Sequence, residues 1–277
     1  MTFGKRILIL APHPDDEMVM ACASMARAQA EGAEIFVLFL THGCIAKETL
    51  FPWQRQFHDT QVALRRTEAE EASLFMGIKI IGFSDRPTRH LWQELPQVRT
   101  EIQTALDAYD IDQLWIPAYE GGHSDHDGLN GLCQSFKDKV SILEFAEYNY
   151  AHGQANAHNF PTFHGTETTL LLTEQERQNK ALALMLYESE RKNLGHIGLA
   201  QECYRPLASY DYRSPPHEGT LWYTRFHWVP FAHPRIDFTK PAAVSEAIQK
   251  SGIRDQGSGI GDRGAGIGAY HPMIFRG

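Results

Sequence analysis

Short apolar runs recur along the first half of the chain, with helical patterns between them. The runs are rich in branched aliphatic and aromatic residues and cover 6–11, 33–40, 78–83, 113–117 and 141–145. Runs that are apolar at nearly every position are typical of strands buried on both faces of a sheet. Strands that alternate with helices indicate parallel pairing. The chain is therefore predicted to be an α/β protein with a mostly parallel, doubly wound sheet.

Helical patterns are predicted at residues 16–31, 60–76, 95–109 and 173–187. Asp15 or Asp16 stands where the N-cap of the first helix is expected, and Gly32 is the expected stop signal. Gly77 follows the second helix in the same way. The fourth helix opens on Thr173-Glu-Gln-Glu, which has the spacing of a capping box.

The composition changes after residue 188, where aromatic residues, proline and glycine become frequent. Within this part, residues 221–229 alternate in the manner of a strand. We therefore predict a core at residues 1–190 and an irregular, aromatic-rich C-terminal extension at 191–277 that packs on it.

The tail carries a G-x-G-x-x-G pattern at Gly259, Gly261 and Gly264. Dinucleotide binding by this pattern needs a preceding strand, a following helix and an acidic residue about 20 positions further on. The chain ends too soon after Gly264 for that arrangement. A glycine-rich surface loop is the favoured interpretation.

The bulk composition narrows the classes of partner. Hydrophobic residues make up 43% and charged residues 22% of the 277 positions, which suits a folded globular protein. The net charge of −8 argues against a generic surface for nucleic acid or anionic membranes. We expect a small-molecule substrate, no nucleic acid and no membrane span, and the sequence leaves a homo-oligomer open.

The cysteines and the first residues favour a reducing compartment. The four cysteines lack C-x-x-C spacing, which suits buried thiols better than disulfides or a thiolate zinc site. The apolar run before Pro12 is too short for a secretory signal or a membrane helix. A cytoplasmic protein is predicted.

Two clusters of polar residues follow predicted strands. His13, Asp15 and Asp16 come directly after the first strand, and His123 and His126 follow the strand at 113–117. Ligands of open α/β sheets bind beyond the carboxyl ends of the strands, where such loops converge. Two imidazoles and one carboxylate leave a coordination position open, as expected of catalytic zinc.

Each cluster also has a simpler explanation. An aspartate at the start of a helix often only caps it. His123 or His126 could be a solvated loop residue or a hydrogen-bonded core residue. The occurrence of both clusters at strand ends of one predicted sheet favours the metal site.

The motifs that carry these clusters resemble those of the LmbE-like, or PIG-L type, zinc-dependent de-N-acetylases. The resemblance rests on A-x-H-P-D-D-E at 11–17, on H-x-D-H at 123–126 and on a helix pattern that begins Arg65-x-x-Glu68. It covers about residues 5–190 and implies a Rossmann-like fold without a nucleotide. Ser124 replaces the usual proline of the second motif, and Gly121 replaces an aromatic residue found in some members, which leaves a role for Tyr119 open.

The resemblance implies that His13, Asp16 and His126 bind Zn²⁺, with Fe²⁺ as the other metal to be considered in the cell. It also implies that Asp15 is the general base that takes a proton from water at the metal. A carboxylate can perform this step near neutral pH because zinc makes water much more acidic.

The resemblance assigns three further roles. His123 would stabilise the oxyanion and protonate the leaving amine, and Asp125 would orient or charge-couple His123. Arg65 would contact the sugar or an anionic group attached to it. An imidazolium suits the first role because an amide leaving group needs a proton.

These observations predict a metal-dependent hydrolase that removes the N-acetyl group from an amino sugar, most plausibly an N-acetylglucosaminyl conjugate. One alternative is an amidase or deacylase of a non-sugar metabolite, since the same groups recognise any amide. Another is a binding protein that keeps the metal without catalysis. The presence of Asp15 and His123 argues against that alternative, because binding alone needs neither a base nor an acid.

Overall fold

The computed structural model describes residues 3–252 and contains one seven-stranded sheet in the order β3-β2-β1-β4-β5-β9-β8. Neighbouring strands among the first five are parallel, while β9 pairs antiparallel with both β5 and β8. The strands are β1 (Arg6–Ala11), β2 (Glu34–Phe39), β3 (Lys79–Phe83), β4 (Gln113–Pro117), β5 (Ser141–Ala146), β8 (Thr168–Leu171) and β9 (Gln201–Pro206). A separate small hairpin pairs β6 (Tyr148–Asn149) with β7 (Asn156–Ala157).

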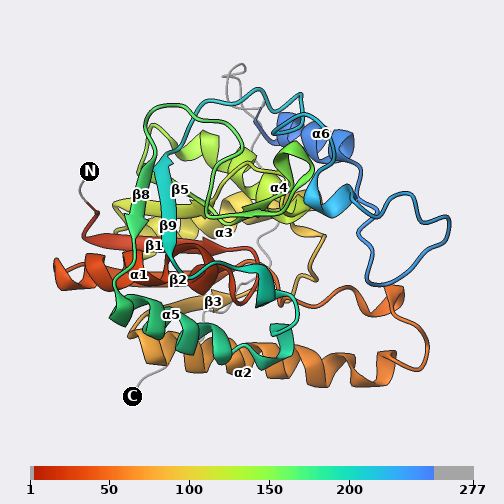
Figure 1. Ribbon diagram of the computed structural model, residues 1–277, viewed down its shortest axis with the longest axis horizontal. Helices are drawn as coiled ribbons and strands as arrows, with labels where there is room; N and C mark the ends of the chain where they lie inside the picture. The colour runs from red at the N-terminus through yellow and green to blue at the C-terminus, as the bar shows by residue number, and fades with distance from the viewer. Residues whose placement is uncertain (1–2, 253–277) are drawn as a thin grey trace, which may run out of the picture.

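Helices cover both faces of the sheet (Figure 1). They are α1 (Asp16–Ala30), α2 (His58–Met76), α3 (Leu95–Ala108), α4 (Ser124–Cys133), α5 (Glu174–Met185) and α6 (Pro241–Gly252). Ile7 and Ile9 of β1 belong to one core cluster together with residues of α1, α2 and α5. Leu8 and Leu10 belong to the other cluster, with residues of α3, α4 and α6. Because β1 is buried on both faces, every residue from Ile7 to Ala11 is apolar and fully buried.

The predicted fold class is confirmed, and the five predicted strands end within about one residue of the observed ones. Helix α2 stops at Gly77, whose φ of 65° is the left-handed conformation expected of a C-terminal glycine. The predicted capping box between Thr173 and Glu176 is present. All four cysteines are free, and three of them are buried.

The prediction of a strand at residues 221–229 is wrong. A 3₁₀ turn spans Trp222–Thr224 and further turns follow it. The backbone N–H of Trp222 donates to the Gly121 carbonyl, and the Thr224 hydroxyl bonds locally to the Leu221 backbone. These local bonds use groups that a β-ladder would need, so the alternation of residue types does not produce a strand.

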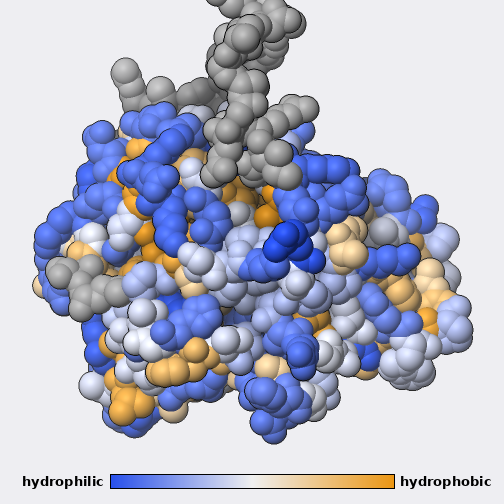
Figure 2. Space-filling model, turned by 90° about the horizontal axis from the view of Figure 1, so that it is seen from above, coloured by the Kyte–Doolittle hydropathy of each residue, from blue (hydrophilic) through white to orange (hydrophobic). Residues whose placement is uncertain are grey.

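The predicted C-terminal extension supplies part of the central sheet, because β9 lies between β5 and β8. The boundary proposed after residue 190 thus falls between two neighbouring strands of one sheet. The glycine pattern at 259–264 lies outside the described residues. Among residues 3–252, no helix combines the length and the apolar character needed to cross a membrane. The face in Figure 2 is mostly hydrophilic, with apolar residues in separate patches.

A buried ion pair contributes to the shape of helix α1. Helix α1 is kinked at Ala21, whose φ of −143° is not helical. The Glu202 carboxylate of β9 accepts the backbone N–H groups of Ala23 and Ser24, both at 2.8 Å. Lys180 of α5 donates to Glu202 at 2.9 Å, and both side chains are fully buried. A side chain that enters the hydrogen-bond ladder of a helix is a recognised cause of a kink.

Replacing Lys180 by methionine should lower the free energy of unfolding by about 3–5 kcal/mol, since the Glu202 charge would stay buried without its counter-ion. Urea-induced unfolding measures this loss. Lys79→Met is the control, because Lys79 pairs with Glu34 at the surface and such pairs contribute only about 0–1 kcal/mol. Equal effects of the two substitutions would contradict the stabilising role of the buried Lys180–Glu202 pair.

Candidate active site

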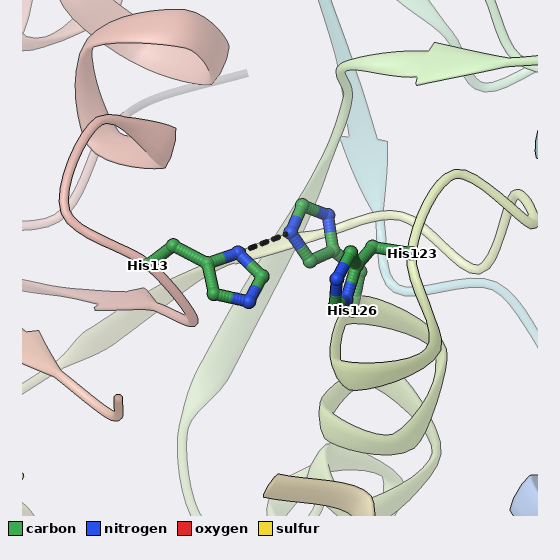
Figure 3. A group of neighbouring side chains, drawn as sticks. All are labelled: His13, His123 and His126. Atoms are coloured by element: carbon green, nitrogen blue, oxygen red, sulfur yellow. Dashed lines mark hydrogen bonds between the residues drawn. The ribbon is translucent and has the colours of Figure 1, made fainter. Parts of the chain in front are cut away.

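The two polar clusters meet at the carboxyl ends of adjacent strands, because β1 pairs with β4. His13 lies on the loop between β1 and α1, while His123 and His126 lie at the start of α4 (Figure 3). His13 and His126 are buried, and His123 is half-buried. The structure therefore brings together all three histidines that the sequence analysis selected.

Three ligand-type atoms form a nearly equilateral triangle. His13 Nδ1 lies 3.1 Å from Asp16 Oδ2, and His126 Nε2 lies 3.2 Å from the same oxygen. The two nitrogens are 3.3 Å apart (Figure 3). A tetrahedral ion with bonds of about 2.0–2.1 Å has ligand atoms separated by about 3.3–3.4 Å. The three atoms thus have the spacing of one face of a tetrahedral metal site.

The electrostatics of the triangle also suit a cation. Although burial opposes ionisation, His126 and His13 hold the pKa of Asp16 well below its usual range. Burial disfavours a charged His13 as well, but Asp16 and Asp125 outweigh it and raise the pKa of His13 to about 10. Protonated His13 therefore supplies the positive charge in the metal-free protein, and metal binding displaces such a proton.

The second nitrogen of His13 faces a carboxylate. His13 Nε2 lies 3.1 Å from Asp125 Oδ2 and 2.7 Å from the Thr88 hydroxyl. Asp125 also accepts backbone N–H groups from Arg89 at 2.6 Å and Leu91 at 3.0 Å. Asp125 is buried, which opposes its charge, yet the bond from His13 and the nearby histidines lower its pKa. An ionised Asp125 can only accept, so His13 holds a proton on Nε2, and Nδ1 is the nitrogen that could release its proton and bind a metal.

Asp125 also contacts His123, the residue with which the sequence analysis paired it. The Asp125 carboxylate is 3.8 Å from His123 Nδ1, farther than from His13. His123 is the N-cap of α4, and its Nδ1 accepts the backbone N–H of Asp125 at 3.1 Å. A neutral imidazole that accepts through Nδ1 has its proton on Nε2. His123 can therefore donate a hydrogen bond through Nε2.

The protonation state of His123 follows from its surroundings. Burial lowers the pKa of His123 well below its usual value, and His13 adds to the effect. The ring centroids of the two histidines are 4.4 Å apart. His123 is thus neutral in the substrate-free protein, whereas the sequence analysis assigned it the protonated form.

Asp15 is held in a strained conformation beside the triangle. It is the N-cap of α1 with φ 127° and ψ −30°, and its side chain makes no capping hydrogen bond. The capping explanation considered above therefore does not apply to Asp15. Strained backbone of this kind concentrates at functional sites. Burial raises the pKa of Asp15 to about 7, and Arg65 limits this increase.

Arg65 lies behind Asp15. Its Nη2 donates to the Pro14 carbonyl at 2.5 Å and is 3.5 Å from Asp15 Oδ2, while Nη1 contacts Glu190. Only 2% of Arg65 is exposed, so direct contact with a substrate would require the guanidinium to be uncovered. Gly43 makes room for this group, since a Cβ there would lie 2.7 Å from it and the φ of Gly43 is +75°.

Tyr119 does not take the place of the aromatic residue absent at Gly121. Its hydroxyl donates to the Ser214 carbonyl at 2.6 Å, and its ring packs against Tyr210 and Tyr212. Gly122 is required by close packing, because a Cβ there would lie 2.4 Å from the Tyr148 carbonyl oxygen.

Sequence reasoning missed two residues of the site, Thr88 and Glu147. Thr88 contacts His13 from a loop far along the chain. Glu147 lies 3.8 Å from His126 Nδ1 and forms a second group of ligand-type atoms with Asp16 and His126. The signal for Glu147 was available, since it is an acidic residue two positions after the end of the predicted strand at 141–145. Nothing in the sequence marked Thr88.

Comparisons with known proteins agree with the motifs. Residues 8–136 match the PIG-L family, described as GlcNAc-PI de-N-acetylase, which confirms the predicted resemblance. A comparison with curated proteins returned no significant match.

Two solved structures illustrate the shared fold. A deacetylase–bog complex from the biosynthesis pathway of teicoplanin aligns with a TM-score of 0.59 and 19% identity, over 73% of this chain and 97% of that one. The A40926 pseudoaglycone deacetylase aligns with a TM-score of 0.55 and 17% identity, over 74% of this chain and 99% of that one. At such identities the likeness concerns the fold alone.

Proposed function

We propose that this chain, whose residues 8–136 match the PIG-L family, is a metal-dependent hydrolase that removes the N-acetyl group from an amino sugar. The observation that carries the proposal is the triangle of His13, Asp16 and His126 with Asp15 beside it. An N-acetylglucosaminyl conjugate is the proposed substrate class. It agrees with the family description and with the teicoplanin-pathway and A40926 pseudoaglycone deacetylases of the same fold.

His13, Asp16 and His126 would hold the ion, which we propose to be Zn²⁺, with Fe²⁺ as the other ion to test. Two imidazoles and one carboxylate are a ligand set of catalytic zinc sites. When bound, a divalent ion polarises an amide carbonyl and makes water acidic enough to react near neutral pH.

Asp15 would act as the general base. It is the carboxylate next to the triangle that has no capping bond, and its conformation is set by the turn into α1. A pKa near the operating pH is favourable for a base, because the group is ionised often enough and still accepts a proton readily. Arg65 would act through Asp15, since it holds the Pro14 carbonyl and neighbours the Asp15 carboxylate.

His123 would stabilise the oxyanion and protonate the leaving amine. Its Nε2–H can donate to the oxyanion that develops on the amide carbonyl, and the negative charge of that oxyanion favours protonation of the imidazole. The same group can then pass its proton to the departing nitrogen. Asp125 would contribute by orienting both histidines, with its carboxylate on His13 and its backbone N–H on His123.

Incubation with a panel of N-acetylated amino-sugar conjugates tests the proposal, with free amine and acetate as the readout. The panel should include N-acetylglucosaminyl conjugates and N-acetylated amides without a sugar. We expect release from the sugar conjugates, abolished by a chelator and restored by Zn²⁺ or Fe²⁺. Release from the non-sugar amides alone would instead support a metabolite amidase, and no release with metal bound would support a binding protein.

A further inference from the structure

Glu147 is a buried carboxylate whose oxygens have no hydrogen-bond donor within residues 3–252. It directly follows β5 and has no exposed surface, and both of its oxygens are without a partner. Burial and the nearby Asp16 carboxylate raise the pKa of Glu147 well above its usual range, so a charge on Glu147 is strongly unfavourable unless a cation lies close by. Such a group therefore needs an explanation, and its neighbours supply one.

The outer nitrogen of a proposed metal ligand lies near the Glu147 carboxylate. Glu147 Oε1 lies 3.8 Å from His126 Nδ1, an electrostatic contact that is longer than a hydrogen bond. The other nitrogen of His126 faces Asp16 and His13 in the triangle. A neutral imidazole can bind a metal through one nitrogen only if its proton is on the other.

Each of the two histidines of the triangle thus has a carboxylate near its outer nitrogen, at 3.1 Å for His13 and at 3.8 Å for His126. His13 directs Nδ1 to the triangle and Nε2 to Asp125, whereas His126 directs Nε2 to the triangle and Nδ1 to Glu147. A carboxylate on the outer nitrogen of a ligating histidine sets the tautomer and makes the inner nitrogen a better ligand.

The backbone around Glu147 is fixed by a second acidic residue. Glu120, on the loop that leads from β4 to His123, accepts the backbone N–H groups of Glu147 at 2.6 Å and Tyr148 at 3.1 Å. Glu120 also accepts the Asn149 side-chain amide at 3.1 Å. The loop that carries His123 and the segment that carries Glu147 are therefore tied together on the His126 side of the site.

We propose that Glu147 is a positioning residue of the metal centre: its carboxylate keeps the His126 proton on Nδ1, so that Nε2 is available to the divalent ion. The inference rests on the proposed function, because it concerns the same metal ion. Glu147 would then be the carboxylate near the outer nitrogen of His126, as Asp125 is for His13.

Metal affinity tests this inference without reference to turnover. The dissociation constant of Zn²⁺ is measured for the metal-free protein by competition with a chromophoric chelator. Glu147→Gln keeps the shape of the side chain and removes its charge. We expect Zn²⁺ to bind about 10–100-fold more weakly, the range found when outer partners of ligating histidines are changed.

Glu144→Gln is the matched control. Glu144 lies three residues earlier in the same segment and is equally buried, but its carboxylate pairs with Arg205 and Asn130. Its loss should lower the stability of the fold and leave the affinity for Zn²⁺ at the parent value. Glu147→Asp serves as a second variant, since it keeps the charge but withdraws it from His126, and it should also weaken binding.

The outcomes separate the two proposals. A parent protein that binds Zn²⁺ together with Glu147 variants of unchanged affinity would overturn the role of Glu147 and leave the proposed function in place. A parent protein that binds neither Zn²⁺ nor Fe²⁺ would overturn both. Should Glu147→Gln fail to fold, parent affinity in Glu147→Asp would by itself overturn the inference.

Discussion

Asp15→Asn is expected to leave the metal content of the protein unchanged while lowering turnover by roughly 100-fold or more, the range typical of a lost general base. The amide of asparagine has nearly the shape of the carboxylate but cannot take a proton from water. Asparagine also tolerates the positive φ of this position better than most residues do, so the turn into α1 should persist. Steady-state kinetics and metal analysis of the same sample check both parts.

The split between metal content and turnover is the decisive feature of this result. A ligand cannot be removed without loss of metal, whereas a base can. Full turnover in metal-loaded Asp15→Asn would show that another group activates water. Loss of metal together with turnover would instead make Asp15 part of the ligand set.

His126→Ala should strip the metal and reduce activity to background. His126 supplies one corner of the triangle, and two remaining protein ligands are too few to retain a divalent ion firmly at a catalytic site. His13→Ala should behave in the same way for the same reason. Metal analysis after gel filtration, combined with the deacetylation assay, measures both effects.

His123→Ala is the control, since it removes a third imidazole within ligand distance of the other two. Because His123 Nδ1 accepts the Asp125 backbone N–H, its other nitrogen carries a proton and is not free to ligate. This variant should keep its metal and lose most of its turnover. Metal loss in His123→Ala with retention in His126→Ala would exchange the roles of the two residues.

The strands were predictable because strands that are buried on both faces consist almost entirely of apolar residues. In β1 and β4, nearly all side chains are apolar, and all except Arg6 are buried on one face or the other. Chain order then places the residues after β1 and β4 at one edge of a parallel sheet. That reasoning was enough to select His13, Asp15, Asp16 and His126 for one site.

Two elements could not be predicted from their own residues. Helix α4 contains Gly128 and Gly131, which lower helix propensity. Both glycines are needed because a Cβ at these positions would lie 2.7 Å from the Trp92 side chain and 2.6 Å from Ile248. Strand β9 contains Glu202 and Arg205, whose buried charges are compensated by Lys180 and Glu144 from distant parts of the chain.

The sequence by itself determined which strands are followed by polar residues, and hence which histidines and aspartates gather at one edge of the sheet. Only the tertiary structure decided which nitrogen of each histidine is free to bind a metal. That choice depends on hydrogen-bond partners such as Thr88, which is 75 residues from His13, and Asp125, which is 112 residues away. A tautomer is set by the group on the opposite side of the ring, and such a group is placed by packing rather than by neighbouring residues in the chain.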